Sequence, residues 1–420
     1  MIQKNLFSCI PCVIISKIQM TKSQILWQKG TCMDSKFENG QLTIFLEGRV
    51  DSSNASAVEA ELQSMIAGNP ATSLVLDAEK LEYISSAGLR IVLRLRKQYE
   101  DMKVINASAE VYDIFDMTGF TEMLTVEKAY RRMSVEGCEV IGEGANGKVY
   151  RIDPDTIVKV YLNPDSLPDI HRERELARKA FVLGIPTAIS YDVVKVGEGY
   201  GSVFELLSAR SIGKRLIAAP EKWEEYTVIM VDLLKKIHST VVKRGDMPDM
   251  KEVALGWANF MRDYLPAAEG EKLVALVNAV PQDDHMMHGD YHIKNVMLQG
   301  DEALLIDMDT LCVGHPVFEL ASVYNAYLGF GETDHSRTKD FLGIDYEIAG
   351  KIWNKTLELY LDTTDPARLA EVADKARIVG YTRLIRRSIR RGGLETDKET
   401  LDYYTEQLIG LLQKTDTLVF

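Results

Sequence analysis

Apolar and polar positions change their period several times between residues 34 and 130, which predicts strands and helices in alternation. Residues 41–47 alternate polar and apolar side chains, as a strand does when one of its faces is buried. The other expected elements are strands at 73–77 and 103–106 and helices at 51–66, 87–96 and 109–117. This order predicts a mixed β-sheet with helices packed mainly on one of its faces.

A second unit, placed at residues 131–420, opens with short strands and a glycine-rich segment. An apolar stripe at three- and four-residue spacing then predicts a helix over 170–183. The remaining segments predict a small lobe at 138–207 and a large lobe with several helices at 208–420. The expected strands are 150–152, which follows the glycine-rich segment, and 156–161, 202–207 and 303–306, and the expected helices are 220–242 and 346–361.

The composition helps mainly by arguing against some classes of function. The chain has 420 residues and a net charge of -13, which argues against general binding to nucleic acids or to membrane surfaces. One basic stretch, residues 383–391, stands out. Because Ile385 and Ile389 are spaced to share a helix face, we favour a packed helix with a solvated basic side over a phosphate-binding surface.

The cysteines and the N-terminus are less informative about chemistry. Five scattered cysteines, an odd number, fit a reducing cytoplasm better than a disulfide framework or a zinc site, and no segment approaches the ~18 apolar residues of a membrane span. We predict that residues 1–33 form a disordered tail. The alternative is a mis-assigned start, since Met33 directly precedes the first domain. The cysteines are Cys9, Cys12, Cys32, Cys138 and Cys312.

Three segments of the first unit, at 46–51, 81–90 and 114–120, resemble the STAS domain, the fold of bacterial anti-sigma factor antagonists. The resemblance covers nearly all of residues 34–130. It implies that Ser86 is phosphorylated by an anti-sigma kinase and that the domain binds an anti-sigma factor. Ser85, Ala87 and Arg90 depart from the family's pattern around this serine.

The position of Ser86 suits a phosphate on physical grounds. A helix N-terminus offers unpaired N–H groups and the positive end of the helix dipole. A phosphate there adds about two negative charges and would switch a partner surface. The alternative is that Ser85 and Ser86 only cap the helix.

The glycine-rich segment contains Gly142, Gly144, Gly147 and Val149 in the pattern G-x-G-x-x-G-x-V. A strand follows it, whereas a Rossmann fingerprint would open a helix. A hairpin of this kind lets backbone amides approach the phosphates of ATP. Lys159, inside the next strand, matches the lysine that holds the α- and β-phosphates in kinases.

That lysine needs a carboxylate partner from the following helix. Glu173 falls on the apolar stripe and Glu175 nearly opposite, so Glu173 is the expected partner and Glu175 the fallback. At the end of the strand 202–207, backbone groups of Glu205 and Leu207 correspond to the adenine-binding hinge of kinase-like folds, although these residues could equally belong to the core.

The most specific signal is H-x-D-x-x-x-x-N at residues 288–295, followed by an apolar strand and two aspartates. Phosphoryl transfer requires a carboxylate that orients the attacking hydroxyl and oxygen ligands for Mg²⁺. Asp290 fits the first role, and Asn295 and Asp307 fit the second. Asp309 is either a second metal ligand or a structural acid.

Together with Gly314–Ala321, these motifs resemble the aminoglycoside phosphotransferase and choline kinase family over residues 138–400, with Glu319 where an aspartate is more usual. The resemblance implies a bilobal protein-kinase-like fold and the use of ATP and Mg²⁺. The chain is therefore expected to combine α/β and α+β architecture in two domains. No long activation segment fits between Asp307 and Glu319, which favours a small hydroxylated substrate over a peptide.

Two other functions stay open at this stage. The kinase-like unit would phosphorylate Ser86 in its own or a partner's STAS domain, helped by the high effective concentration that fusion gives. Alternatively, it would bind nucleotide without catalysis, which the complete set of catalytic residues argues against.

Overall fold

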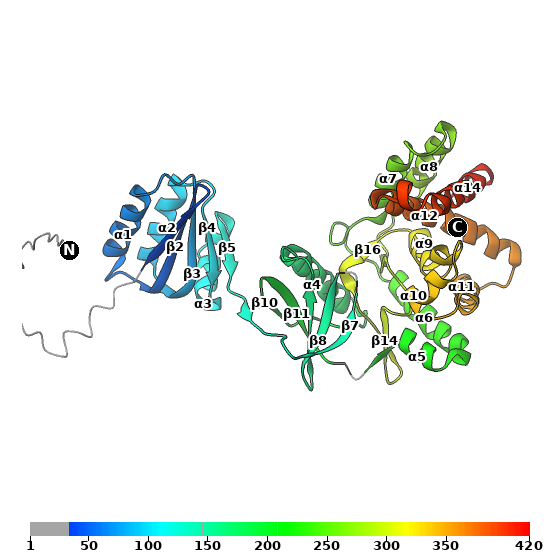
Figure 1. Cartoon of the computed structure of the whole chain (residues 1–420), viewed down its shortest axis with the longest axis horizontal. Helices are drawn as coiled ribbons and strands as arrows, with labels where there is room; N and C mark the ends of the chain where they lie inside the picture. Colours follow the sequence, from blue (N-terminus) through cyan, green and yellow to red (C-terminus); the bar gives the residue numbers. More distant parts are fainter. Residues whose placement is uncertain (1–32, 145, 208) are drawn as a thin grey trace, which may run out of the picture. The chain divides into compact units, whose positions relative to one another are not determined.

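The computed structural model describes residues 33–144, 146–207 and 209–420. The predicted tail at 1–33, apart from Met33, lies outside the described residues, as do Cys9, Cys12 and Cys32. The chain divides into two compact units, with the boundary between Arg131 and Arg132 (Figure 1).

The first unit contains a five-stranded sheet in the order β1-β2-β3-β4-β5. β1 and β2 are antiparallel, and the other neighbours are parallel, so the predicted mixed sheet is confirmed. The strands are β1 (Asp34–Glu38), β2 (Gln41–Val50), β3 (Ser73–Ile84), β4 (Lys103–Ala107) and β5 (Thr125–Lys128), and the helices are α1 (Ala55–Ala67), α2 (Ser86–Gln98) and α3 (Ala109–Met117).

The core of this unit lies on one face of the sheet. Leu42, Ile44 and Leu46 of β2 are buried against the helices, whereas Phe45 between them is 38% exposed. The two strands that the sequence did not predict, β1 and β5, are the sheet edges. Their residues are mostly exposed, so they carry little of the alternation that marks a half-buried strand.

The small lobe of the second unit contains a six-stranded sheet in the order β6-β10-β11-β9-β8-β7, in which the neighbours from β10 to β7 are antiparallel. Helix α4 (Leu167–Val182) follows β9 and supplies a buried stripe that includes Ile170, Ala177 and Ala180. The strands are β6 (Arg131–Arg132), β7 (Glu139–Glu143), β8 (Gly147–Asp153), β9 (Thr156–Tyr161), β10 (Asp192–Val196) and β11 (Gly199–Glu205).

The large lobe is mainly helical, and its core surrounds α9, which is buried along its length after Pro316. None of the helices in the described ranges is long and apolar enough to cross a membrane. The helices are α5 (Ile212–Ala218), α6 (Trp223–His238), α7 (Met250–Met261), α8 (Ala267–Ala279), α9 (Pro316–Tyr327), α10 (Ser336–Leu342), α11 (Tyr346–Leu361), α12 (Pro366–Arg390), α13 (Gly393–Thr396) and α14 (Lys398–Lys414). The short strands are β12 (Arg210–Ser211), β13 (Met286–Met287), β14 (Val296–Gln299), β15 (Glu302–Leu305) and β16 (Cys312–Val313).

Candidate active site

The glycine-rich segment forms the turn of an antiparallel hairpin between β7 and β8. The Gly144 N–H donates to the Gly147 carbonyl at 2.9 Å. A Cβ atom on Gly147 would lie 2.4 Å from the backbone oxygen of Val160, so glycine is required here by the close approach of β9. Gly142 and Val149 face each other across the hairpin, and the arrangement is strand, loop, strand.

Lys159 joins three segments that are far apart in the sequence. Its Nζ lies 3.1 Å from Glu173 Oε1 on α4 and 2.6 Å from Asp307 Oδ1 after β15. Glu175 is instead exposed and pairs with Lys179 at 3.0 Å. Burial alone would lower the pKa of Lys159, but the two carboxylates outweigh burial and raise the pKa, so the lysine is charged.

Tyr161 supports this pair, and the sequence reasoning missed it. Its hydroxyl donates to Glu173 Oε2 at 2.7 Å and lies 3.3 Å from Ser202 Oγ on β11. Tyr161 stands two positions after Lys159 on β9, and side chains two positions apart on a strand share a face. That spacing is the signal by which it could have been found.

The hinge between the lobes follows β11. Glu205, its last residue, is exposed, and Leu207 is half-buried. The N–H of Leu206 donates to the Asp155 carbonyl at 2.7 Å, which ties the hinge to the turn between β8 and β9.

Asp290, His292 and Asn295 lie together on the loop before β14. His292 Nδ1 accepts from the Lys294 N–H, so its Nε2–H is available to Asp290 Oδ2, which lies 3.4 Å away. The Asn295 amide nitrogen donates to the Asp290 carbonyl at 3.0 Å. Burial raises the pKa of Asp290, but His292 and the nearby Arg383 and His288 outweigh burial and lower the pKa to about 2.

The two aspartates after β15 occupy different environments. Asp307 has a left-handed backbone, with φ of 63°, and its side chain is 43% exposed. Asp309 lies near Asn146 of the glycine-rich loop, at 3.5 Å from its Nδ2. Burial, together with the carboxylates of Asp307 and Glu173, raises the pKa of Asp309 to about 6. The site therefore holds more negative charge than Lys159 balances.

Glu319 binds the backbone of the loop at residues 288–295, called the catalytic loop below. Its carboxylate is fully buried and accepts the N–H groups of His288 and Gly289, the latter at 3.1 Å from both oxygens. Gly289 has φ of +81°, and a Cβ there would lie 2.4 Å from the Thr310 carbonyl. Arg383 of α12 donates to the Gly289 carbonyl at 3.2 Å. The roles of Glu319 and Arg383 were not predicted.

Comparison with known families agrees with this geometry. Residues 137–348 match the phosphotransferase enzyme family (APH). The chain belongs to this family. The second unit is therefore a phosphotransferase.

Residues 33–133 match the STAS domain family. Over 92 residues this chain is 36% identical to "Putative anti-sigma factor antagonist BtrV" of Bordetella bronchiseptica, an alignment that covers 21% of this chain and 78% of that protein. The first unit is therefore a STAS domain fused to the phosphotransferase.

Solved structures show similarity at low identity. The gentamicin complex of APH(2")-IIa is 13% identical with a TM-score of 0.42, and the match covers 73% of this chain and 98% of that one. The ternary complex of a thermostable APH(4)-Ia variant with ADP and hygromycin B is 11% identical with a TM-score of 0.46, covering 67% and 95%. Unphosphorylated SpoIIAA, an anti-sigma factor antagonist, is 19% identical with a TM-score of 0.21, covering 23% and 87%.

In the STAS domain, the two serines at the start of α2 differ in their contacts. The Ser85 hydroxyl caps the helix by accepting from the N–H groups of Ala87 at 3.2 Å and Gly88 at 3.5 Å. Ser86 is the first residue of the helix and is exposed. Of the two serines considered as caps, Ser85 makes the capping hydrogen bonds.

The phosphotransferase offers oxygen donors that fit a magnesium ion. No group of three or more His, Cys, Asp or Glu side chains within the described ranges is arranged to hold a metal by itself. Mg²⁺, however, is commonly bound by one or two carboxylates together with substrate phosphates. Asp307 and the amide oxygen of Asn295 are suitable donors, and the excess of carboxylates around Lys159 favours a cation.

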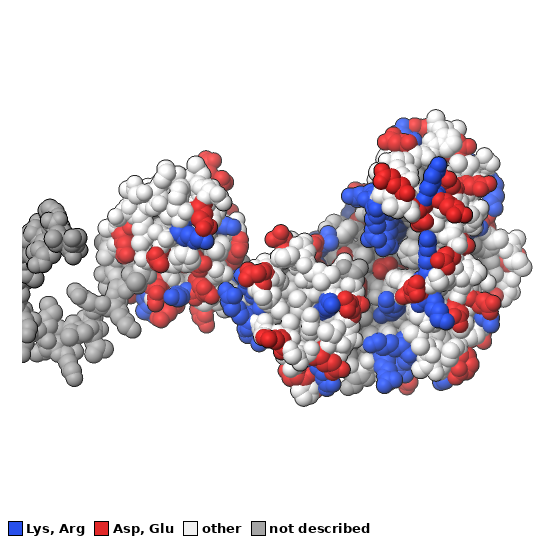
Figure 2. Space-filling model, viewed as in Figure 1, with Lys and Arg blue, Asp and Glu red and all other residues white. Residues whose placement is uncertain are grey.

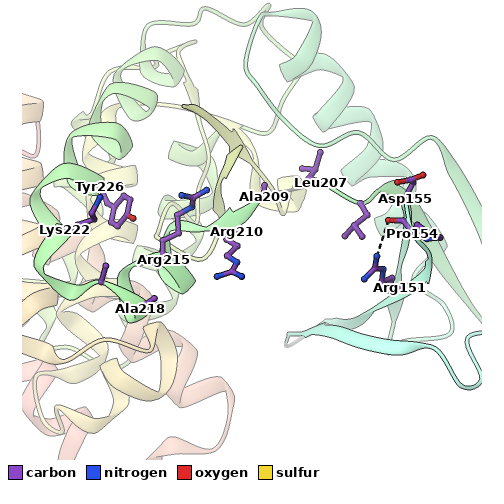
Figure 3. Close-up of a pocket in the computed structure, with 12 residues that line it drawn as sticks. Arg151, Pro154, Asp155, Leu207, Ala209, Arg210, Arg215, Ala218, Lys222 and Tyr226 are labelled. Atoms are coloured by element: carbon purple, nitrogen blue, oxygen red, sulfur yellow. Dashed lines mark hydrogen bonds between the residues drawn. The ribbon is translucent and has the colours of Figure 1, made fainter. Parts of the chain in front are cut away.

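A groove of about 710 Å³ lies beside the hinge (Figure 3). Its residues come from the turn between β8 and β9 on one side and from α5 and its surroundings on the other. It includes Leu207 of the predicted adenine site but none of Lys159, Asp290, Asn295 and Asp307. We therefore do not assign the chemistry to this groove.

Proposed function

We propose that the phosphotransferase unit transfers the γ-phosphoryl group of ATP to a hydroxyl group of a small molecule, with Mg²⁺ as cofactor. The observation that carries this proposal is the meeting of Lys159, Glu173 and Asp307, which come from β9, α4 and the end of β15. A charged lysine fixed by two carboxylates is the arrangement that positions ATP phosphates in kinases.

Each predicted residue then has a role toward ATP. Lys159, oriented by Glu173, binds the phosphates, and backbone groups of Glu205 and Leu207 at the hinge bind adenine. The glycine-rich hairpin covers the phosphates through Gly142, Gly144, Gly147 and Val149. Asn295 and Asp307 would hold Mg²⁺, which neutralises charge on the phosphates when bound. Asp309 is the candidate for a second ligand or a structural acid.

Asp290 orients the acceptor hydroxyl. With its pKa lowered to about 2, the carboxylate is ionised at neutral pH and can accept a hydrogen bond from that hydroxyl. Phosphoryl transfer passes through a loose transition state, so positioning contributes more than strong basicity. His292 would keep Asp290 in place.

The short connection after Asp307 supports a small acceptor. Only a single turn of 3-10 helix at Met308–Thr310 and the two-residue strand β16 separate Asp307 from α9. Protein kinases hold peptides with a much longer segment at this place.

The test is transfer of label from [γ-³²P]ATP in the presence of the low-molecular-mass fraction of a bacterial extract. We expect labelled small molecules with the wild-type chain and about 10²–10⁴-fold less with Asp290→Asn, the range of a positioned catalytic carboxylate. Label that appears at the same rate with Asp290→Asn would contradict the proposal.

A second candidate function is a phosphorylation switch in the STAS domain. The specific observation in its favour is that Ser86 is exposed at the helix N-terminus while Ser85 supplies the cap. A phosphate on Ser86 would change the surface that an anti-sigma factor contacts. In the same labelling experiment, label on the protein that disappears in Ser86→Ala would support this function, and unlabelled protein would exclude phosphorylation in cis.

A further inference from the structure

The end of α12 carries a row of arginines that begins at the catalytic loop. Arg383, Arg387 and Arg391 follow at four-residue spacing, so they share one side of the helix and its C-cap over about 12 Å. Arg383 donates to the Gly289 carbonyl, next to Asp290. Figure 2 shows Lys and Arg side chains gathered over the part of the large lobe where α12 ends.

Arg387 and Arg391 line a pocket of about 450 Å³, a volume suited to a small ligand. Both arginines are exposed, whereas the rings of Phe330 and Phe341 in the same pocket are half-buried and Tyr404 is buried. The other lining side chains used here are Phe330, Arg337, Phe341 and Asp397.

The pocket adjoins the proposed acceptor site through two contacts. The ring of Phe341 meets the His292 ring edge-to-face, with centroids 5.1 Å apart. The same histidine lies 3.4 Å from the Asp290 carboxylate. Phe341 and His292 therefore form a chain of contacts that leads from the pocket to Asp290.

The charge of this pocket is not balanced by the protein. Arg337 pairs with Asp397 at 3.5 Å. Across the residues that the structure describes, neither Arg387 nor Arg391 has a carboxylate within salt-bridge distance. Burial lowers the pKa of Arg387 most, and repulsion from Arg391 and Arg383 lowers it further, whereas Asp290 raises it. An anion between them would relieve that repulsion.

A simpler role for these arginines is to complement the negative end of the α12 dipole. That role applies equally to Arg390, which does not line the pocket. It does not explain why Arg387 and Arg391 share a pocket with three aromatic rings, those of Phe330, Phe341 and Tyr404. The dipole therefore accounts for basic residues at this helix end but not for their arrangement.

We infer that the acceptor is a hydroxylated small molecule that carries a phosphate or carboxylate group, which Arg387 and Arg391 bind while its hydroxyl reaches Asp290. Guanidinium groups bind both anions through paired hydrogen bonds. This inference rests on the proposed function, because it concerns the acceptor of the same transfer.

The experiment measures binding to the full chain loaded with Mg·AMP-PNP. Nucleotide binding is measured first, in wild type and in Arg387→Gln/Arg391→Gln, and its failure in wild type would reject the proposed function itself. Isothermal titration then compares sorbitol, gluconate, sorbitol 6-phosphate and kanamycin, which are neutral, carboxylated, phosphorylated and cationic. Arg390→Gln is the matched control on the same helix.

We expect at least one anion to bind about tenfold or more tightly than sorbitol, and the double variant to lose this preference. The stronger of the two anions identifies the group that the site prefers. Arg390→Gln should keep the preference within about twofold. Four results would overturn the inference while leaving nucleotide binding intact. They are equal binding of sorbitol and the anions, no binding of either anion, tighter binding of kanamycin than of the anions, and an equal loss of the preference in Arg390→Gln.

Discussion

The two sides of the phosphotransferase site differ in whether their cationic side chains are paired with carboxylates. On the side assigned to the nucleotide, the half-buried Lys159 is paired with the carboxylates of Glu173 and Asp307. On the side assigned to the acceptor, Arg387 and Arg391 are exposed and lack a carboxylate partner in the described ranges. Charges that the protein pairs internally should matter for folding, whereas charges left for a ligand should matter mainly for binding.

The largest effect on stability is expected from Lys159→Met. It leaves the Glu173 carboxylate buried without its cation, and breaking such a pair from one side destabilises by about 3 kcal/mol. Urea unfolding followed by circular dichroism measures this change. The double variant Lys159→Met/Glu173→Gln should recover part of the loss.

The matched control is Lys148→Met on the neighbouring strand, where the pair with Glu143 is exposed. It should leave the unfolding midpoint nearly unchanged. A loss of stability as large as that of Lys159→Met would contradict this distinction, because the two ion pairs would then contribute equally to stability.

Glu319→Gln should lower the free energy of unfolding by about 2 kcal/mol at neutral pH, because the buried carboxylate accepts two backbone N–H groups. Burial raises the pKa of Glu319, but His238, His288 and Gly289 outweigh burial and hold it below the usual value of 4.5. A carboxyl whose pKa is lower in the folded state stabilises the fold above its unfolded pKa.

The difference between wild type and Glu319→Gln should therefore be full above about pH 5 and shrink as pH falls below 4.5 through the folded pKa. Unfolding in urea at a series of pH values provides the measurement. Glu225→Gln, an exposed acid paired with Lys222, is the control. A difference that grows on acidification would show that the carboxylate is not the stabilising form.

At the start of α2, Ser85 contacts the protein's own backbone, whereas Ser86 is exposed. Ser85→Ala removes the cap and should destabilise the STAS domain by about 1 kcal/mol. Ser86→Ala should have little effect, since Ser85 supplies the cap contacts. Thermal unfolding of the two variants compares them directly, and equal losses would mean that both hydroxyls serve the fold.

The smallest effect is expected from Arg387→Gln. Because no carboxylate of the described chain pairs with this arginine, stability should stay within about 0.5 kcal/mol of wild type. A larger loss in urea unfolding would assign Arg387 to the fold and remove it from the acceptor site.

The pairing of Lys159 with Glu173 could be predicted because both residues stand on regular elements. The stripe of α4 separated Glu173 from Glu175, and the glycine pattern followed by a strand identified the hairpin. The mixed sheet of the first unit followed from alternating polar and apolar residues. In each case a local period determines which way a side chain points.

The acceptor side could not be predicted in this way. The stretch 383–391 was interpreted as a packed helix with a solvated basic side, and the helix and its buried Ile385 are as expected. What the pattern could not reveal is that Phe330 and Phe341 close a pocket against Arg387. These contacts join segments about fifty residues apart, and no local period reports them. Glu319 was missed as a support of Gly289 for the same reason.

The assignment of this site to Mg·ATP is tested most directly by isothermal titration of wild type and Asp307→Asn with ATP, in the presence and absence of Mg²⁺. We expect Mg²⁺ to tighten ATP binding roughly tenfold or more in wild type and most of this gain to disappear in Asp307→Asn. Equal affinity with and without Mg²⁺ in wild type, or an undiminished gain in the variant, would contradict the assignment of this site to Mg·ATP.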